Sequence, residues 1–447
     1  MRFIKLYTVL LIAILSTPLS AQNETPDKVW TLKECVDYAL ENNISVKQSE
    51  LDKLNQEQSV TEAKGSFLPN LNASASQNFN FGSSIDVTGG RVSADYRSNN
   101  YSLNSNIILF DGFANVNTLN QAKINVAVQE ANIAKMKNDI ALNVVNAYLQ
   151  VLFAKEQIKI AQFQVDISQK EVERIGSLVD VGLAPKGDLL NIKATLSSDE
   201  QTLIDATNAF DIATLRLAQL LQLPEGTILV EDVEVAEPSN AIIANEANVI
   251  FEKAAISFPE IKAAKLSIES AEKGISISKA RYLPSLSFNY SLSTAYQHRQ
   301  GYPDFFPYSE QLDNNLGHIL GLTLSVPIFN RFQFRSAVTR AEINKERAEY
   351  NLESEKIRLR ESVQIAYTDA KSASKSFDAA KNSVEAQKEA FDYAQERFQV
   401  GNMNAFDFNQ TKNRLFTAES QLLRAKYDYT FKIKVLEFYY GIPFVVE

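Results

Sequence analysis

The sequence offers few side chains for covalent or metal chemistry. Its 447 residues include only two histidines, His298 and His318, and one cysteine, Cys35. Histidine is the commonest general acid–base group, and soft metal sites draw on cysteine and histidine. A nucleophile elbow, a zinc-binding helix motif and a phosphate-binding loop are not found in the sequence. The sequence therefore favours neither an enzyme nor a protein with a bound cofactor or metal.

Two acidic residues at matched positions are the more informative candidates. Asp188 and Asp407 each follow a glycine, Gly182 or Gly401, by six residues. Asn404 and Asp407 also have the spacing of a helix cap, and a carboxylate in the first turn of a helix is stabilised by the helix dipole. The local interpretation of Asp407 is therefore that it stabilises the start of a helix.

The N-terminus and the overall charge restrict where the chain works. A basic start at Met1–Lys5, an apolar run at Leu6–Leu15 and small residues up to Ala21 predict a secretory signal over 1–21. No later segment reaches the roughly 20 apolar residues of a membrane helix, so insertion into a membrane would require strands. The net charge of −9 argues against a nucleic-acid partner.

The chain is an internal duplication. Lys64–Leu71 recurs as Lys279–Leu286, 215 positions later, and Phe110–Phe113 recurs as Phe329–Phe332, 219 positions later. The second offset then holds without a gap as far as Leu223-Pro224 and Ile442-Pro443, which chance similarity would not do. We predict a first repeat at 22–224, a joining segment at 225–247 and a second repeat at 248–447.

Each repeat predicts a helix, two strands, a long helix and a further helix. Thr31 and Glu34 have capping-box spacing, and the first helix should run from 31 to about 66, before Pro69. Period-two alternation predicts strands near 68–81, 99–110, 284–296 and 317–328. The segments 82–98 and 297–316 between them are rich in loop residues. Strands of a membrane barrel have this pattern, and so does an ordinary half-buried hairpin.

The long helices carry the strongest signal. A helix from about 113 to 181 would be on the order of 100 Å long, and helices of half that length near 31–66 and 188–222 could flank it end to end. Apolar and small residues recur at three- and four-residue spacing, as in a coiled coil. In the first repeat this seam is Val144, Ala147, Val151, Ala154, Ile158, Ala161 and Val165; in the second it is Val363, Ala366, Ala370, Ala373, Phe377, Ala380, Val384, Gln387, Phe391, Ala394 and Phe398.

Four strands are too few to close a membrane barrel. An open edge leaves backbone groups unpaired in hydrocarbon, and known barrels have eight or more strands. Subunits would have to pool their strands, and three copies would supply twelve. The predicted fold class is mainly α with membrane β: a duplicated helix–β-hairpin–long helix–helix repeat, forming a trimeric 12-stranded β-barrel continued by a helical barrel.

The duplicated order of elements resembles the outer-membrane efflux protein family of TolC-like channels over about 30–443. The segments Val181–Leu190 and Arg397–Phe408 resemble that family's helix tips, and Leu223-Pro224 and Ile442-Pro443 resemble its repeat closures. The resemblance implies a homotrimer in outer-membrane lipid with a periplasmic helical extension. It also implies a periplasmic adaptor (membrane fusion protein), an inner-membrane pump or exporter, and a passive exit duct for small molecules.

The same resemblance implies a gated periplasmic entrance at the helix tips. There Asp407 would form a ring of three carboxylates, which favours cations. The sequence has Gln410 where some members carry a second acid, and Phe398 and Met403 in place of a tyrosine and an arginine that hold the entrance closed. We therefore expect a gate closed by packing. The candidate entrance residues are Asp188, Asn191, Phe398, Met403, Phe406, Asp407 and Gln410, with Gly182 and Gly401 at the tips.

Two alternatives stay open from the sequence. A periplasmic coiled-coil adaptor or scaffold without a pore would need only the apolar seams, although it would not explain strands at matched positions in both repeats. The segment 225–247 is either a belt around the middle of the tube or a solvated linker, because it interrupts the helical pattern.

Overall fold

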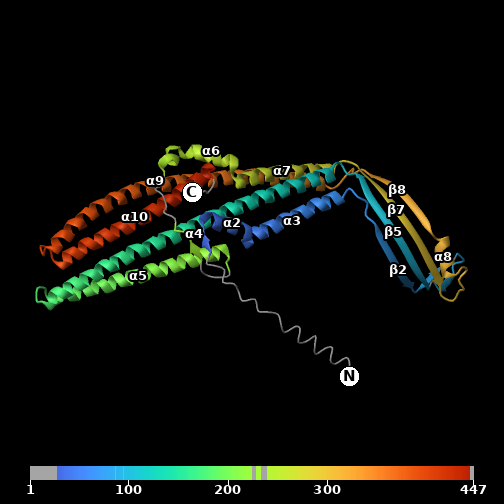
Figure 1. The fold of residues 1–447 in the computed structure, drawn as a ribbon. Helices are drawn as coiled ribbons and strands as arrows, with labels where there is room; N and C mark the ends of the chain where they lie inside the picture. The colour runs from blue at the N-terminus through green and yellow to red at the C-terminus, as the bar shows by residue number, and fades with distance from the viewer. Residues whose placement is uncertain (1–27, 86, 94, 224–227, 233–238, 443–447) are drawn as a thin grey trace, which may run out of the picture.

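The computed structural model describes residues 28–85, 87–93, 95–223, 228–232 and 239–442. The expected signal segment 1–21, Pro224 and Pro443 of the repeat closures, and 225–227 and 233–238 of the joining segment lie outside the described residues. The molecule is elongated. Its helices form a long, gently curved body, and a four-stranded sheet extends from one end at an angle (Figure 1).

The two repeats contain the same four helices. Each repeat has helices of 11, 22, 67 and 36 residues, in that order. The first repeat contributes α2 (Leu32–Asn42), α3 (Ile44–Gly65), α4 (Ala114–Asp180) and α5 (Lys186–Leu221); the second contributes α6 (Ala247–Ser257), α7 (Pro259–Ala280), α9 (Gln333–Gln399) and α10 (Ala405–Tyr440). Their bounds differ by 215 residues before the sheet and by 219 after it, as the sequence offsets do. The fold is mainly helical.

The prediction of one continuous helix over 31–66 is wrong. The helix starts as expected, since Thr31 and Glu34 form a capping box with bonds of 3.0 and 3.1 Å. It breaks at Asn43, whose backbone is extended at φ −60° and ψ 127°. The Asn43 side chain accepts a hydrogen bond from the backbone N–H of Ser45 at 2.9 Å, so it caps α3. In the second repeat the break falls at Phe258, and Pro259 opens α7.

One antiparallel sheet joins the two repeats. Its strands are β2 (Asn72–Asn80), β5 (Tyr96–Phe110), β7 (Ser285–Arg299) and β8 (Gly317–Ser325), in the order β2-β5-β7-β8. The central pairing, β5 with β7, runs from Tyr96 opposite Arg299 to Phe110 opposite Leu286. Strands β2 and β8 are the two edges, and the sheet of one chain is open.

The segments expected as loops contain short elements of their own. Between β2 and β5, β3 (Ser83–Ile85) pairs with β4 (Arg91–Ser93). Between β7 and β8 lies a short helix, α8 (Tyr308–Asn314). The prediction of plain loops was wrong at these places, because elements of three to seven residues are too short to produce a periodic signal.

The seam residues of both long helices face the interior. The buried ones are Val144, Val151, Ala154 and Ala161 in α4, and Val363, Ala366, Ala370, Ala373, Phe377, Phe391, Ala394 and Phe398 in α9. The other predicted seam positions are half-buried. They pack each long helix against its neighbours, α4 against α5 and α9 against α10, while α7 lies along both α4 and α9. The small side chains let these helices approach closely.

The described parts of the joining segment are packed, unlike a solvated linker. Strand β6 (Leu229–Val230) pairs in parallel with β1 (Val29–Trp30), and the Glu231 N–H donates to the Trp30 carbonyl at 3.1 Å. A 3₁₀ helix, η1 (Asn240–Ala244), follows, and its Ile242 belongs to the core around α6, α9 and α10. These contacts lie midway along the helical body (Figure 1).

Cys35 is a core residue of α2. It is fully buried between α2 and α4, and burial raises the pKa of its thiol to about 12. A thiol in such a site is inert. Of the helices in the described part of the chain, none combines the length and the apolar character needed to cross a bilayer.

Gly112 fixes the junction between sheet and helices. It lies between β5 and α4 with φ +70°, and a Cβ there would stand 2.6 Å from the Ala280 carbonyl oxygen and 2.9 Å from Leu283 Cβ. The left-handed conformation alone costs a residue with a side chain about 1–2 kcal/mol. The glycine is therefore needed for its conformation and for the close approach of α7.

We predict that Gly112→Ala destabilises the protein much more than Gly182→Ala. Gly182 has a similar φ of +77° but nothing within 4 Å of an added Cβ, so it isolates the conformational cost of about 1–2 kcal/mol. The measurement is chemical unfolding of both purified variants, followed by helical circular dichroism. Equal unfolding midpoints for the two variants would show that the close approach of α7 to Gly112 does not contribute to the free energy of unfolding.

Candidate functional site

The helical body ends in two adjacent tips, where α4 turns into α5 and α9 turns into α10 (Figure 1). Gly182 and Gly401 have φ of +77° and +78° just past the long helices. The next residue of each turn, Leu183 or Asn402, donates its N–H to a carbonyl five residues back, Leu178 or Arg397, at 2.8 Å. These are Schellman-type helix ends, which explains the glycines that the sequence singled out.

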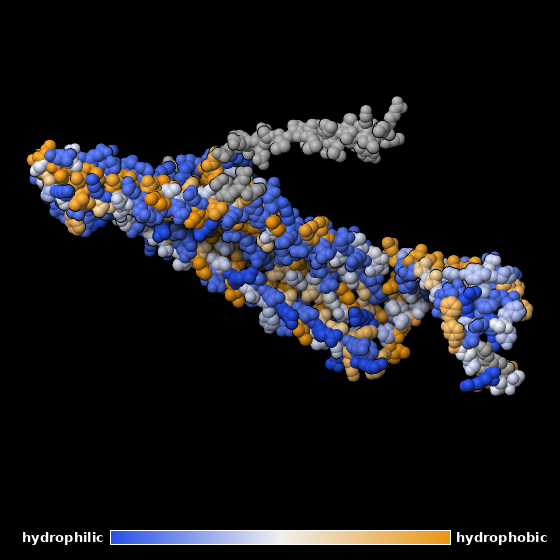
Figure 2. Space-filling model, turned by 90° about the horizontal axis from the view of Figure 1, so that it is seen from below, coloured by the Kyte–Doolittle hydropathy of each residue, from blue (hydrophilic) through white to orange (hydrophobic). Residues whose placement is uncertain are grey.

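Hydrophobic side chains are exposed at the tips. Val181, Leu183, Val400 and Phe406 are 67%, 77%, 71% and 76% exposed. Figure 2 shows hydrophobic residues at this end of the helical body, interspersed with polar ones. Exposed apolar side chains that lie close together are available for contacts with other chains.

The predicted cap at Asp407 is confirmed. The Asp407 N–H donates to Asn404 Oδ1 at 2.8 Å, and Asn404 Nδ2 donates to Asp407 Oδ2 at 2.9 Å. Asp407 is nevertheless exposed, so its charge also faces solvent. Asp188 has no matching cap: α5 follows Pro185, which offers no side-chain acceptor, and Asp188 is half-buried.

A polar groove lies between α5, α9 and α10 beside the tips. It has a volume of about 920 Å³, and four of the predicted entrance residues line it: Asp188, Asn191, Phe406 and Gln410. Its other lining residues are mostly amides and hydroxyls that were not expected at the entrance, among them Thr195, Asn413, Thr417 and Gln421; Arg414 also lines it, and Gln387 was expected only as a seam position. A signal existed, because Gln410, Arg414, Thr417 and Gln421 recur at helical spacing on α10.

The residues expected to pack the gate divide into two groups. Phe398 is only 6% exposed and stacks on Phe408, with ring centroids 4.4 Å apart and planes 10° apart. Met403 is half-buried against the same cluster. Phe406, in contrast, projects outward. Phe398 and Met403 therefore pack within one chain, and only Phe406 faces the outside.

Phe398 also connects the two helical hairpins, which are α4 with α5 and α9 with α10. The guanidinium carbon of Arg174, on α4, lies 4.1 Å from the centroid of the Phe398 ring, whose other neighbour is Phe408 on α10. A cation–π contact contributes about 0.5–2 kcal/mol and an aromatic pair about 0.5–1.5 kcal/mol. This stack joins the hairpins by packing. Phe398 has no hydroxyl and Met403 has no charge, so these two residues cannot form a hydrogen-bonded closure.

Among the described residues, no group of three or more histidine, cysteine or acidic side chains is placed to hold an ion. What the tips present is exposed apolar side chains, a carboxylate and a polar groove. Such a surface suits the passage or docking of other molecules.

Comparison with known proteins agrees with this architecture. The model of the family described as outer membrane efflux protein matches residues 35–222 and 250–441, one stretch in each repeat. These stretches make up most of the chain, and the chain belongs to the outer membrane efflux protein family.

Individual relatives are distant but cover most of the chain. Outer membrane efflux protein BepC of Brucella suis is 22% identical over 402 residues, 89% of this chain and 82% of the relative. Outer membrane protein TolC of Escherichia coli is 23% identical over 392 residues, 87% of this chain and 77% of the relative.

Solved structures share the fold. The Campylobacter jejuni CmeC outer membrane channel matches with a TM-score of 0.74 at 18% identity, over 92% of this chain and 85% of that chain. VceC from Vibrio cholerae matches with a TM-score of 0.74 at 16% identity, over 92% and 96%.

We predict that Phe398→Ala loosens the tips. Truncating a buried phenylalanine costs about 3–5 kcal/mol, and here it also removes the partner of Arg174 and Phe408. Hydrogen exchange of the amides near 391–408 should speed up markedly. The control is Tyr393→Ala on the same helix, which is 65% exposed and should change exchange little. Unchanged exchange in Phe398→Ala would rule out the stack as a stabilising contact.

Proposed function

We propose that this chain is one subunit of a trimeric outer-membrane channel, the passive exit duct for small molecules in a tripartite efflux system. Its partners would be a periplasmic adaptor and an inner-membrane pump or exporter. Family membership supports the general class. The observation that carries the proposal is the sheet, which is open at both edges and attached to helices far too long for a compact monomer.

The strand directions favour pooling between copies. Because the four strands alternate in direction, the edge strands β2 and β8 run in opposite directions. Joining β8 of one copy to β2 of the next would continue an antiparallel sheet without a break. Three copies would give a 12-stranded barrel, within the known range, and would remove the edges that hydrocarbon does not tolerate.

The two faces of the sheet differ in polarity. In β8, Leu320, Leu322 and Leu324 are 68%, 68% and 65% exposed on one face, and Leu322 lies opposite Phe288 of β7. The other face carries mostly polar residues, Ser287, Asn289 and Ser291, with Ile319 opposite Ser291. An apolar outside and a polar lumen are what a membrane barrel requires. The apolar face would contact outer-membrane lipid.

The helices would then form the periplasmic extension. Each long helix has 67 residues and so spans about 100 Å. The tips lie at the end away from the sheet, where they would form the periplasmic entrance (Figure 1). The exposed Phe406 and Asp407 of each copy would face one another there, and a ring of carboxylates would favour cations.

The direct test is reconstitution of the purified protein into planar lipid bilayers. A channel gives discrete steps of ionic current. A periplasmic adaptor or scaffold without a pore gives none, and it leaves the membrane fraction on washing with carbonate. That second result would overturn the proposal.

We predict that Asp407→Ala lowers the cation selectivity and the block of the current by divalent cations, since it removes the carboxylate from the entrance. Asn404→Ala is the control, because it removes the cap of α10 at a cost of about 1 kcal/mol, together with the hydrogen bond from Asn404 Nδ2 to Asp407 Oδ2, but keeps the charge of Asp407. It should keep the selectivity of the parent protein. Equal selectivity in all three proteins would exclude a carboxylate ring at Asp407.

A further inference from the structure

Three polar side chains occupy core positions of three different helices. Ser168 of α4, Asp199 of α5 and Lys412 of α10 are 0%, 4% and 0% exposed. Each lies seven residues from buried apolar neighbours on its own helix: Ala161 and Ile175, Ile192, and Ala405. They therefore stand at the coiled-coil positions where apolar residues are expected, and we refer to them as the polar triad.

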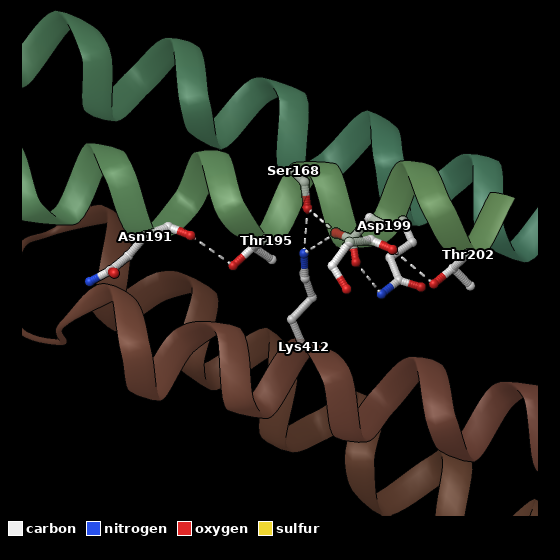
Figure 3. Close-up of polar contacts among 8 residues, drawn as sticks. Ser168, Asn191, Thr195, Asp199, Thr202 and Lys412 are labelled. Atoms are coloured by element: carbon white, nitrogen blue, oxygen red, sulfur yellow. Dashed lines mark hydrogen bonds and ion pairs between the residues drawn. The ribbon is translucent and has the colours of Figure 1, made fainter. Parts of the chain in front are cut away.

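The polar triad is one connected hydrogen-bonded unit (Figure 3). Lys412 Nζ lies 3.0 Å from Asp199 Oδ2 and donates to Ser168 Oγ at 2.5 Å. Ser168 in turn donates to the same Asp199 oxygen, while Gln164 Nε2 donates to Asp199 Oδ1 at 2.7 Å. Lys412 alone comes from the second repeat. The bonds therefore tie α10 to the first hairpin, α4 with α5.

The triad is not a product of the duplication. Lys193 occupies the position of Lys412 in the first repeat but is exposed, and Ala418 occupies the position of Asp199 in the second. The same lysine is thus buried in one repeat and solvated in the other. The difference arises because α10 faces the first hairpin at this point, so the triad is specific to the contact between hairpins.

We propose that the polar triad holds the second hairpin, α9 with α10, at one position against the first and thereby sets the resting width of the entrance. Apolar burial is non-directional, so the cluster around Phe398 and Phe408 constrains the relative position of the helices less specifically than an ion pair does. An ion pair in a dry core has one favourable geometry, because separating it leaves two buried charges unpaired. A single polar core residue is known to fix the register of paired helices at a cost in stability.

The triad lies close enough to the tips that opening the entrance would disturb it. Lys412 lies eleven residues beyond Gly401, with the apolar cluster of Ile175, Ile192, Phe398 and Phe408 on the tip side. A swing of the second hairpin that widens the entrance has to move Lys412 away from Asp199 and Ser168. The claim that the triad sets the width of the entrance rests on the proposed channel function. The claim that the triad fixes the position of one hairpin against the other does not depend on that function.

The test uses a variant that removes the triad's charges and keeps its volume, Lys412→Met with Asp199→Leu. Replacing both partners of a buried ion pair by apolar residues usually preserves folding, whereas a single change leaves an unpaired charge. Lys193→Met is the matched control, since it makes the same chemical change at the exposed counterpart. Two readouts are taken: the single-channel conductance at rest, and the distance between spin labels at Leu183→Cys and Val400→Cys, both exposed tip positions. Cys35 is buried and stays unlabelled.

The double variant should conduct severalfold more than the parent at rest and show longer and broader distances between the tip labels, while Lys193→Met behaves as the parent. Parent-like distances in the double variant would overturn the proposal. The label distances need no current, so they separate the two claims. If the distances change in a protein that never conducts, the role of the triad in positioning the hairpins is supported and the proposed channel function is refuted. If the distances change and the conductance does not, the triad does not control the entrance.

Discussion

Each 67-residue helix is held against shorter neighbours, α4 against α5 and α7 and α9 against α10 and α7, by a face of small and apolar residues. Alanine at positions such as Ala154, Ala370 and Ala373 lets the axes approach, and β-branched or aromatic neighbours such as Val144 and Phe377 fill the remaining space. Short helices of 11 and 22 residues then stack end to end along the long ones. The elongated body, the remote tips and the attached sheet all depend on that seam.

The features of the fold that could be predicted from the sequence are those whose signal extends over many residues. The offsets of the duplication, the long helices, the seam and the four main strands are periodic features that sum over tens of positions. The features that could not be predicted are those that depend on one residue or one short segment. The break at Asn43 depends on a single side chain that caps the next helix, and β3, β4 and α8 are too short to be seen as periodic. Strand ends also shifted, since β5 begins at Tyr96 and β7 continues to Arg299.

The candidate site divides in the same way. Local chemistry explains Gly182, Gly401 and the cap formed by Asn404 and Asp407, and these could be recognised from spacing alone. The contact of Phe398 with Arg174 and the polar triad could not, because both depend on which faces of the two hairpins meet. Lys193 and Lys412 illustrate this, as they occupy equivalent positions of the duplication and differ only in tertiary surroundings. The two hairpins are similar in sequence because of the duplication. They differ in which residues are buried, because their tertiary contacts differ.

In the proposed channel, the sheet of one chain closes only with strands from other copies. The most direct measurement is the mass of the mature protein solubilised in detergent, by light scattering corrected for the bound detergent. We expect three chains per particle and no stable folded species without detergent. A folded monomer in plain buffer would contradict this expectation, because the edges of β2 and β8 would then be compatible with water and no pooled barrel would be needed.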